Sequence, residues 1–234
     1  QFTALRFFEG RLMTARAFDL DLMITNADLR YLKVYCRGFK NSQSLSALKN
    51  LQSLVLAYGK DIEDVGFARE LKQLAVLDLH QTGVRDLAPL AGLVHLAKVN
   101  VDMSPVERLP SGKLPSLREL RAFSTRITDA EAKAFRAAHP NCRLLHRWTD
   151  ALQVSLANVT RMRVRSGGTC HRDIGGEETL LDTKDVADIR KFISQISIDE
   201  SERPFHCQCC GDPTFEFYAG DKLVAMVGFH HGHG

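Results

Sequence analysis

Most of the residues in this sequence that could bind a metal or act as nucleophiles lie in its last third. Four of the six cysteines and five of the nine histidines fall between Cys170 and His233. Thiolate sulfur and imidazole nitrogen are the ligands that a tetrahedral zinc ion prefers, and Cys207 and Cys210 have the Cys-x-x-Cys spacing of a structural zinc site. We therefore expect zinc to be bound within a Cys/His cluster made of Cys170, His171, Cys207, Cys209, Cys210, His230 and His231.

A β-hairpin would bring the two halves of the Cys/His cluster together. Residues 214–218 and 222–227 are rich in aromatic and β-branched side chains and flank Gly220, which is typical of a hairpin. A turn centred near Gly220 pairs residues whose numbers sum to about 440. This register predicts two facing pairs at the open end of the hairpin, Cys210 with His230 and Cys207 with His233.

Other interpretations of the Cys/His cluster stay open. Cys170 could form a disulfide in an exported protein, or all the thiols and imidazoles could be free. A catalytic zinc site would need a water ligand and a nearby acid or base, for which Asp212, Glu177 and Glu178 are the local candidates. Thiol redox chemistry normally uses a Cys-x-x-Cys pair that opens a helix, whereas here Gly-Asp-Pro leads from Cys210 into a strand. We favour a structural zinc ion, because a domain of about 80 residues with a small core gains stability from one.

The other elements of this region predict a small α+β domain over residues 149–234, made of a strand, a helix and the hairpin. Residues 160–165 alternate apolar and basic side chains, as a half-buried strand does. A helix with one apolar face follows over residues 186–196, and Asp182 or Thr183 can cap it. The region loosely resembles small Cys/His-bearing modules of uncharacterised bacterial proteins, and this resemblance implies no particular activity.

The first 148 residues repeat the pattern apolar-x-x-apolar-x-apolar at intervals of 21 to 23 residues. In such a repeat, alternate residues of a short strand point inward and bury their side chains only against neighbouring units. Weaker copies that begin at Phe2 and His139 would cap the two ends. The pattern predicts an α/β leucine-rich-repeat solenoid over residues 1–148. Five copies are clear: Leu29, Leu32 and Val34; Leu51, Leu54 and Leu56; Leu74, Leu77 and Leu79; Leu96, Val99 and Val101; and Leu117, Leu120 and Ala122.

The third clear copy, over residues 79–93, resembles the repeats of the internalin-like class of bacterial leucine-rich-repeat proteins. Thr82 occupies the position that Asn usually holds in that class, and the resemblance extends over residues 2–148. It implies that Thr82 bonds to free backbone groups of the turn. The last clear copy departs from the class, because a true α-helix is expected after Thr128, which would be its N-cap, with Glu131 completing a capping box.

In this scaffold the residues between the inward-facing positions form the concave strand surface. They mix Tyr, Arg and Phe, which are enriched at protein interfaces, with dispersed charge. The expected function is a non-enzymatic scaffold that binds a protein or peptide there. The alternative is a metal-dependent hydrolase or thiol redox protein that uses the Cys/His cluster. The expected partner-binding residues are Tyr31, Lys33, Tyr35, Tyr58, Asp78, His80, Lys98, Asn100, Arg118, Arg121 and Phe123.

The composition bears on nucleic-acid binding, on membrane insertion and on the cellular compartment of the protein. Residues 1–150 hold 22 Lys and Arg against 16 Asp and Glu, and no basic run is interleaved with stacking aromatics, so we expect no nucleic-acid partner. No apolar stretch approaches the roughly 18 residues that a membrane-spanning helix needs. We expect a cytoplasmic protein, with export left open because the first residue is Gln rather than Met. The sequence predicts neither the partner's identity nor the oligomeric state.

Overall fold

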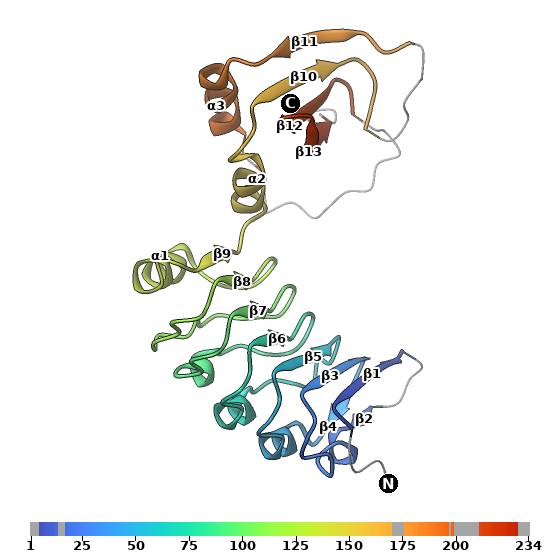
Figure 1. Cartoon of the computed structure of the whole chain (residues 1–234), viewed down its shortest axis with the longest axis vertical. Helices are drawn as coiled ribbons and strands as arrows, with labels where there is room; N and C mark the ends of the chain where they lie inside the picture. The colour runs from blue at the N-terminus through green and yellow to red at the C-terminus, as the bar shows by residue number, and fades with distance from the viewer. Residues whose placement is uncertain (1–4, 14–16, 170–175, 197, 199–210, 229–234) are drawn as a thin grey trace. The chain divides into compact units, whose positions relative to one another are not determined.

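The computed structural model describes residues 5–13, 17–169, 176–196, 198 and 211–228. Contacts within the chain divide it into two compact units, Gln1–Arg147 and Trp148–Gly234 (Figure 1). Each unit has its own sheet and its own apolar core. Within the described residues, no helix is long and apolar enough to cross a membrane.

The first unit is built on a parallel sheet of seven strands that follow one another in chain order (Figure 1). Partner residues on neighbouring strands from β3 to β8 lie 21 to 23 positions apart, which confirms the interval predicted for the five clear copies. The strands at the two ends, β1 and β9, pair with their neighbours at an offset of 24, so the offsets of 27 and 22 implied by the weaker copies at Phe2 and His139 were wrong. A short additional sheet pairs β2 (Phe18–Asp19) with β4 (Phe39–Lys40). The seven strands are β1 (Phe7–Leu12), β3 (Tyr31–Cys36), β5 (Ser53–Ala57), β6 (Val76–Asp78), β7 (Lys98–Asn100), β8 (Glu119–Arg121) and β9 (Arg143–Leu145).

The inward-facing apolar residues of the strands form one continuous ladder. Leu54 pairs with Leu32 on one side and Leu77 on the other, and all three are at most 1% exposed. The ladder continues through the apolar residues of β7, β8 and β9 in the same register. Because these side chains are buried between repeats, each repeat depends on its neighbours for its core.

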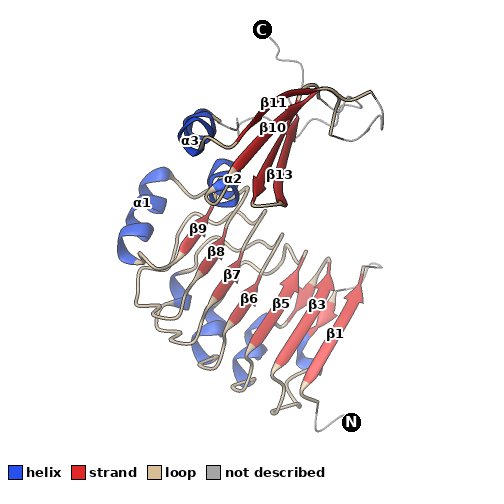
Figure 2. Ribbon diagram, turned by 45° about the horizontal axis from the view of Figure 1, so that its top comes forward, coloured by secondary structure: helices blue, strands red, loops and turns tan. Residues whose placement is uncertain are grey.

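Most return segments contain a short helix (Figure 2), and these helices are of the 3-10 type rather than α-helices. The last return segment is the α-helix α1 (Asp129–Ala138), and the Thr128 side chain accepts a hydrogen bond from the Glu131 N–H, as predicted. The Glu131 carboxylate, however, accepts a 2.8 Å hydrogen bond from the Leu109 N–H, so it links α1 to the preceding repeat. The 3-10 helices are η1 (Leu20–Leu22), η2 (Ser42–Ala47), η3 (Gly66–Glu70) and η4 (Ala88–Leu90).

A buried pair of hydroxyl groups satisfies the turn that follows β6. The Thr82 hydroxyl donates to the Leu79 carbonyl oxygen at 2.8 Å, which confirms the role that the resemblance implies for it. The Ser104 hydroxyl, one repeat further on, donates to the same carbonyl at 2.9 Å and accepts from the Thr82 N–H. These bonds connect successive turns in the interior, where an unpaired carbonyl would destabilise the fold.

Four of the repeats also turn through a left-handed backbone conformation, which the sequence did not predict. Tyr58, Gln81, Met103 and Ser124 have positive φ angles between 54° and 75°, and they follow one another at the repeat interval. The N–H of Tyr58 donates to the His80 carbonyl oxygen at 2.9 Å. The chain therefore leaves these strands in a left-handed conformation that extends the pairing between repeats.

The second unit contains a four-stranded antiparallel sheet in the order β11-β10-β12-β13, together with two helices. The predicted strand, helix and hairpin are present, whereas β11 and α2 were not predicted. Asp185 caps α3 by accepting from the N–H groups of Ala187 and Asp188, so the expectation of Asp182 or Thr183 as the cap was wrong. The elements are α2 (Trp148–Leu156), β10 (Arg161–Arg165), β11 (Thr179–Thr183), α3 (Val186–Gln195), β12 (Thr214–Ala219) and β13 (Lys222–Gly228).

The hairpin of β12 and β13 has a slightly different register from the predicted one. Thr214 pairs with Gly228 and Ala219 with Lys222, so the paired numbers sum to 442 and 441 rather than about 440. A register shift between Phe217 and Tyr218 accounts for the change along the strands. The facing pairs predicted between cysteines and histidines lie outside the described residues.

The apolar side of this second sheet packs against its helices. Met162 of β10 and Phe217 of β12 are paired and buried together with Ile189 of α3. Phe192 of α3 stacks on Phe215 with ring centroids 5.0 Å apart. The opposite side of the sheet carries the three arginines of β10, whose charges need carboxylate partners.

A glycine at the closest approach of two repeats gives a test of the packing. A Cβ atom at Gly83 would lie 2.2 Å from the Lys60 carbonyl oxygen and 3.3 Å from that of Ile62. We expect Gly83→Ala to lower the free energy of unfolding by about 1–3 kcal/mol, because backbone atoms cannot give way as a side chain can. Urea denaturation followed by far-UV circular dichroism measures the loss. In the control Gly10→Ala, the new Cβ would meet only the Phe8 ring, at 3.2 Å. Equal losses in the two variants would contradict this account.

Candidate functional site

The exposed side of the parallel sheet, here called the strand face, carries the side chains that alternate with the buried ladder. Register places Lys33, Val55 and Asp78 in one row across β3, β5 and β6, and the row continues through Asn100 and Arg121. A second row runs from Tyr31 through Ser53, Val76 and Lys98 to Glu119. The rows bring together residues about 22 positions apart in the sequence, as the repeat predicts.

One end of the strand face is aromatic. The ring centroids of Tyr35 and Tyr58 lie 6.3 Å apart, and His80 meets the Tyr58 ring edge-on at 5.4 Å. Tyr31 is 44% exposed, and its ring lies 6.5 Å from that of Phe7 on β1. Together with two cations that lie over Tyr35, these residues make up the aromatic end: Phe7, Arg11, Tyr31, Lys33, Tyr35, Tyr58 and His80.

At the other end of the strand face, two arginines are paired with carboxylates. Arg121 contacts the Asp102 carboxylate at 2.8 Å, and the same carboxylate accepts from the Phe123 N–H. Asn100 donates to Asp78 at 3.1 Å. Arg143 forms an ion pair with Glu119 on the neighbouring strand. These residues make up the charged end: Asp78, Asn100, Asp102, Glu119, Arg121 and Arg143.

Two of the expected partner-binding residues do not lie on the exposed strand face. Phe123 is only 3% exposed and lies beneath Arg121, whose guanidinium carbon is 5.5 Å from the ring centroid. Arg118 donates to the Pro115 carbonyl oxygen at 2.9 Å and lines a separate cavity of about 300 Å³. The other expected residues occupy the strand face or its border: Tyr31, Lys33, Tyr35, Tyr58, Asp78, His80, Lys98, Asn100 and Arg121.

The cavity beside Arg118 lacks a reactive thiol. Cys142 lines it, but burial raises the pKa of this thiol to about 11, so the thiolate is scarce at neutral pH. His139, also on the wall, is held between the carbonyl oxygens of Phe135 and Gly112, at 3.2 and 3.0 Å from its two ring nitrogens. These contacts fix the end of α1 and are those of a structural histidine.

The zinc site cannot be located on the described part of the chain. All the expected ligands, Cys170, His171, Cys207, Cys209, Cys210, His230 and His231, lie outside the described residues. Among the described residues there is no group of three or more Cys, His, Asp or Glu side chains that could hold a metal. Of the expected acid or base candidates, Glu177 pairs with Arg165 at 2.9 Å, and Asp212 accepts from the Gly167 N–H at 3.1 Å. Zinc binding stays a prediction.

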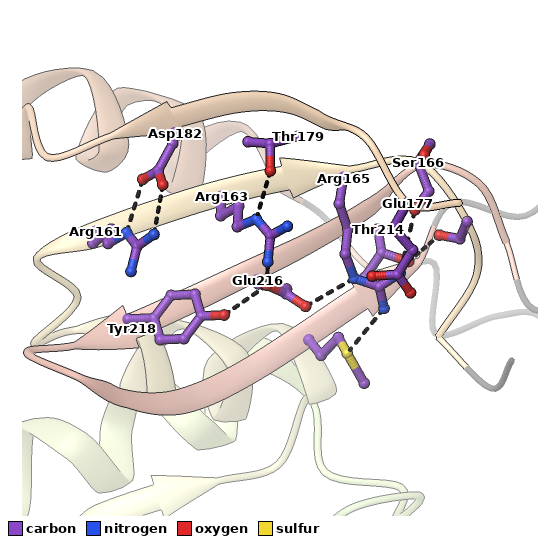
Figure 3. Close-up of polar contacts among 12 residues, drawn as sticks. Arg161, Arg163, Arg165, Ser166, Glu177, Thr179, Asp182, Thr214, Glu216 and Tyr218 are labelled. Carbon is purple, nitrogen blue, oxygen red and sulfur yellow. Dashed lines mark hydrogen bonds and ion pairs between the residues drawn. The ribbon is translucent and has the colours of Figure 1, made fainter. Parts of the chain in front are cut away.

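A buried ion pair dominates the polar side of the second sheet (Figure 3). Arg165 and Glu216 both have side chains that are 0% exposed, and Arg165 Nε donates to Glu216 Oε1 at 2.8 Å. Tyr218 donates its hydroxyl to the other oxygen of Glu216 at 2.6 Å. Burial, together with this bond to Glu216, raises the pKa of the Tyr218 hydroxyl, which keeps the phenol protonated.

Arg165 also organises the loop that follows β10. Its terminal nitrogens donate to the carbonyl oxygens of Ser166 and Gly168, at 3.3 and 3.2 Å, and to Glu177. The neighbouring arginines are paired too: Arg161 with Asp182 at 2.8 Å, and Arg163 with Glu216 at 3.6 Å (Figure 3). Three arginines thus meet three carboxylates, so this side of the sheet is neutral overall and suits a structural role better than the binding of an anion.

The alternating arginines were visible in the sequence, but the burial of one of them was not. Alternation alone predicts a solvated basic side for β10, and Arg161 and Arg163 fit that pattern with partly exposed side chains. Arg165 differs because its partner Glu216 lies 51 positions away on β12. The useful signal would have been a lone acidic residue inside the apolar strand 214–218, which needs a buried cation.

Comparison with other proteins finds similarity in solved structures alone. No protein-family model matches the sequence, and no curated protein is significantly similar to it. The chain is similar to an internalin from Listeria monocytogenes, with 19% identity over 57% of this chain and 47% of that one, and a TM-score of 0.40. It is also similar to a leucine-rich-repeat protein of Leptospira interrogans, with 18% identity over 52% of this chain and 44% of that one, at a TM-score of 0.37. It is similar as well to internalin C2 from Listeria monocytogenes, with 14% identity over 61% of this chain and 80% of that one, and a TM-score of 0.38. The chain spans about half the length of the first two proteins.

The buried ion pair yields a stability test. Glu216→Gln removes the fully buried carboxylate and leaves Arg165 with Glu177 as its one carboxylate partner, and we expect a loss of about 3 kcal/mol in the free energy of unfolding. Urea denaturation followed by the fluorescence of Trp148, which belongs to the second unit and is the sole tryptophan, measures this loss. The double variant Arg165→Met/Glu216→Leu should recover part of it, because neither of the two fully buried charges then remains, although the bonds from Arg165 to the loop are lost. Asp182→Asn is the control, since it breaks an exposed pair and should cost much less. If Glu216→Gln lowered the free energy of unfolding no more than Asp182→Asn does, the buried ion pair would not stabilise the second unit as described.

Proposed function

We propose that this protein is a non-enzymatic interaction protein that binds a protein or peptide on the strand face of its first unit. The observation that carries the proposal is the alternation of buried and outward-facing residues within each strand. Alternate residues form the buried ladder, and the others form ordered rows on the strand face that are mostly aromatic, polar or charged, with the buried Val55 as an exception. Because packing does not fix the residue types of these rows, they are free to be selected for recognition.

The composition of the strand face supports a protein partner over a small substrate. Tyr and Arg contribute most to binding energy at protein interfaces, and both types lie in these rows. Their side chains are held in place by ring contacts and ion pairs, so less conformational entropy is lost on binding. The described cavity beside Arg118 lies off the strand face and offers no activated nucleophile.

Affinity capture with point variants tests the role of the strand face. The intact chain, Tyr58→Ala and Lys98→Ala are each immobilised and exposed to a cell extract, and captured proteins are quantified by mass spectrometry. We expect at least one strand-face variant to lose a specific partner about tenfold or more, as truncation of a central interface residue does. Lys72→Ala, an exposed residue outside the strand rows, is the control and should retain the partner. A partner lost from the control but not from the strand-face variants would place binding elsewhere.

We also propose that the second unit is stabilised by zinc bound to the Cys/His cluster. Support comes from the hairpin, because Thr214 pairs with Gly228 and the chain therefore enters and leaves the hairpin at the same end. Cys210 precedes this pair by four positions, and His230 follows it by two. A chain rises about 3.3 Å per residue in a strand, so these separations are short enough for shared coordination.

Metal analysis tests this second proposal. We expect untagged protein to contain one zinc ion per chain by plasma mass spectrometry, and Cys207→Ser and Cys210→Ser each to lose it. Removal of zinc by a chelator should also lower the midpoint of urea unfolding seen by Trp148 fluorescence, because metal binding contributes directly to folding. His95→Ala, an exposed histidine of the first unit, is the control. Protein without metal, and with fewer than six titratable thiols, would support disulfides instead; a zinc ion with an exchangeable water would favour the hydrolase.

A further inference from the structure

The arginines at the two ends of the strand face have different partners. At the charged end, Arg121 and Arg143 each contact a carboxylate of the strand face, from Asp102 and Glu119 respectively. Like Arg121, Arg11 at the aromatic end lies over a ring: its guanidinium carbon is 5.1 Å from the centroid of Tyr35. Among the described residues, no carboxylate is within ion-pair distance of Arg11.

A second cation lies over the same ring. Lys33 Nζ is 5.9 Å from the Tyr35 centroid, and its one ion pair among the described residues is a 3.6 Å contact with Glu9. Both partners of that contact are more than a third exposed, so the pair is weak and screened by solvent. The aromatic end therefore holds two cations and one acid, whereas each arginine of the charged end has a carboxylate partner. Lys98 of β7 also has no ion pair among the described residues, but it lies over no ring.

A guanidinium placed over a ring remains able to bind a carboxylate. Cation–π contact satisfies part of its charge but uses none of its N–H groups, which stay available for two parallel hydrogen bonds to a carboxylate. The ring also limits the motion of the arginine, which lowers the entropy lost on binding. The exposed rings of Tyr31 and Phe7 lie on the same strands and offer apolar contact beside the charge.

Stacked bases fit this surface less well than a protein segment does. Single-stranded nucleic acids bind on open aromatic faces, with several cations that follow the backbone. Here two cations lie over the Tyr35 ring, and Tyr58 is in edge contact with His80 at an interplanar angle of 83°.

We infer that the aromatic end of the strand face binds an acidic segment of a protein partner, whose carboxylate is received by Arg11 and Lys33 while a neighbouring apolar side chain packs on Tyr31 and Phe7. This inference rests on the proposed function, because it names the partner class for the same strand face. It goes beyond that proposal because it assigns binding to the aromatic end and requires the bound segment to be negatively charged.

Selection from a random peptide library tests the inference without a known partner. Phage displaying random 12-residue peptides are selected on the intact chain, and enriched peptides are synthesised with a fluorescein label for anisotropy titrations. We expect the enriched peptides to carry Asp or Glu beside an aromatic or aliphatic residue. Their affinity should fall about tenfold in Arg11→Gln and should weaken as sodium chloride is raised, because the contact is charge-assisted.

Arg143→Gln is the matched control, since it removes the same charge from the same face at the charged end. It should leave the affinity of the acidic peptides within about twofold, because exposed charges farther apart than a Debye length interact little. Circular dichroism of both variants checks that the fold is retained.

The outcomes separate the inference from the proposal on which it rests. Enriched peptides that are neutral or basic, or that lose affinity in Arg143→Gln but not in Arg11→Gln, overturn the inference and leave strand-face binding intact. No enrichment, or peptides that bind both variants equally, overturns the inference and counts against the strand face as a binding surface. Tighter binding of a labelled 20-nucleotide oligothymidine, weakened by Arg11→Gln, would assign the aromatic end to nucleic acid. Concentration-dependent dimers in sedimentation, lost in Arg11→Gln, would assign it to a second copy.

Discussion

The fold of the first unit depends on the burial of one repeat's apolar ladder against the next. No single repeat has a core of its own, so Leu54 is buried because Leu32 and Leu77 lie in the same register on either side. The interval of 21 to 24 residues between paired positions aligns the ladder and the backbone hydrogen bonds together. This constraint fixes the inward residues and leaves the outward ones open to variation, which is why recognition can be placed on the strand face without disturbing the fold.

The same constraint explains which parts of the fold the sequence predicts. Burial selects residue type, so the ladder positions, the strand of residues 161–165 and the hairpin could all be identified from apolar spacing. The left-handed turns at Tyr58, Gln81 and Met103 could not, because hydrogen bonding to the next repeat imposes them against the ordinary preference of these residues. Strand β11 was missed for a related reason: four of its five residues are exposed, so no alternation marks it.

The candidate sites were predictable only where position along a strand decides exposure. Lys33, Asp78 and Asn100 lie on the strand face because they alternate with ladder residues inside the strands. The expectation that Phe123 lies on the strand face was wrong because β8 ends at Arg121. Beyond that residue the alternation no longer applies, and the Phe123 ring is buried. The burial of Arg165 depends on the pairing of β10 with β12, a tertiary contact that local pattern does not contain.

The two units show why a cation can serve either folding or recognition. Arg165 is surrounded by Glu216, Glu177 and two backbone carbonyl oxygens, so its donors are used and it can bind nothing further without breaking the loop it holds. Arg11 is stabilised by the Tyr35 ring, a partner that compensates charge without occupying hydrogen-bond donors. Saturated charges strengthen a structure, whereas incompletely paired ones can attract a ligand. The recognition that we propose therefore belongs where the pairing of charges is incomplete, at the aromatic end of the strand face.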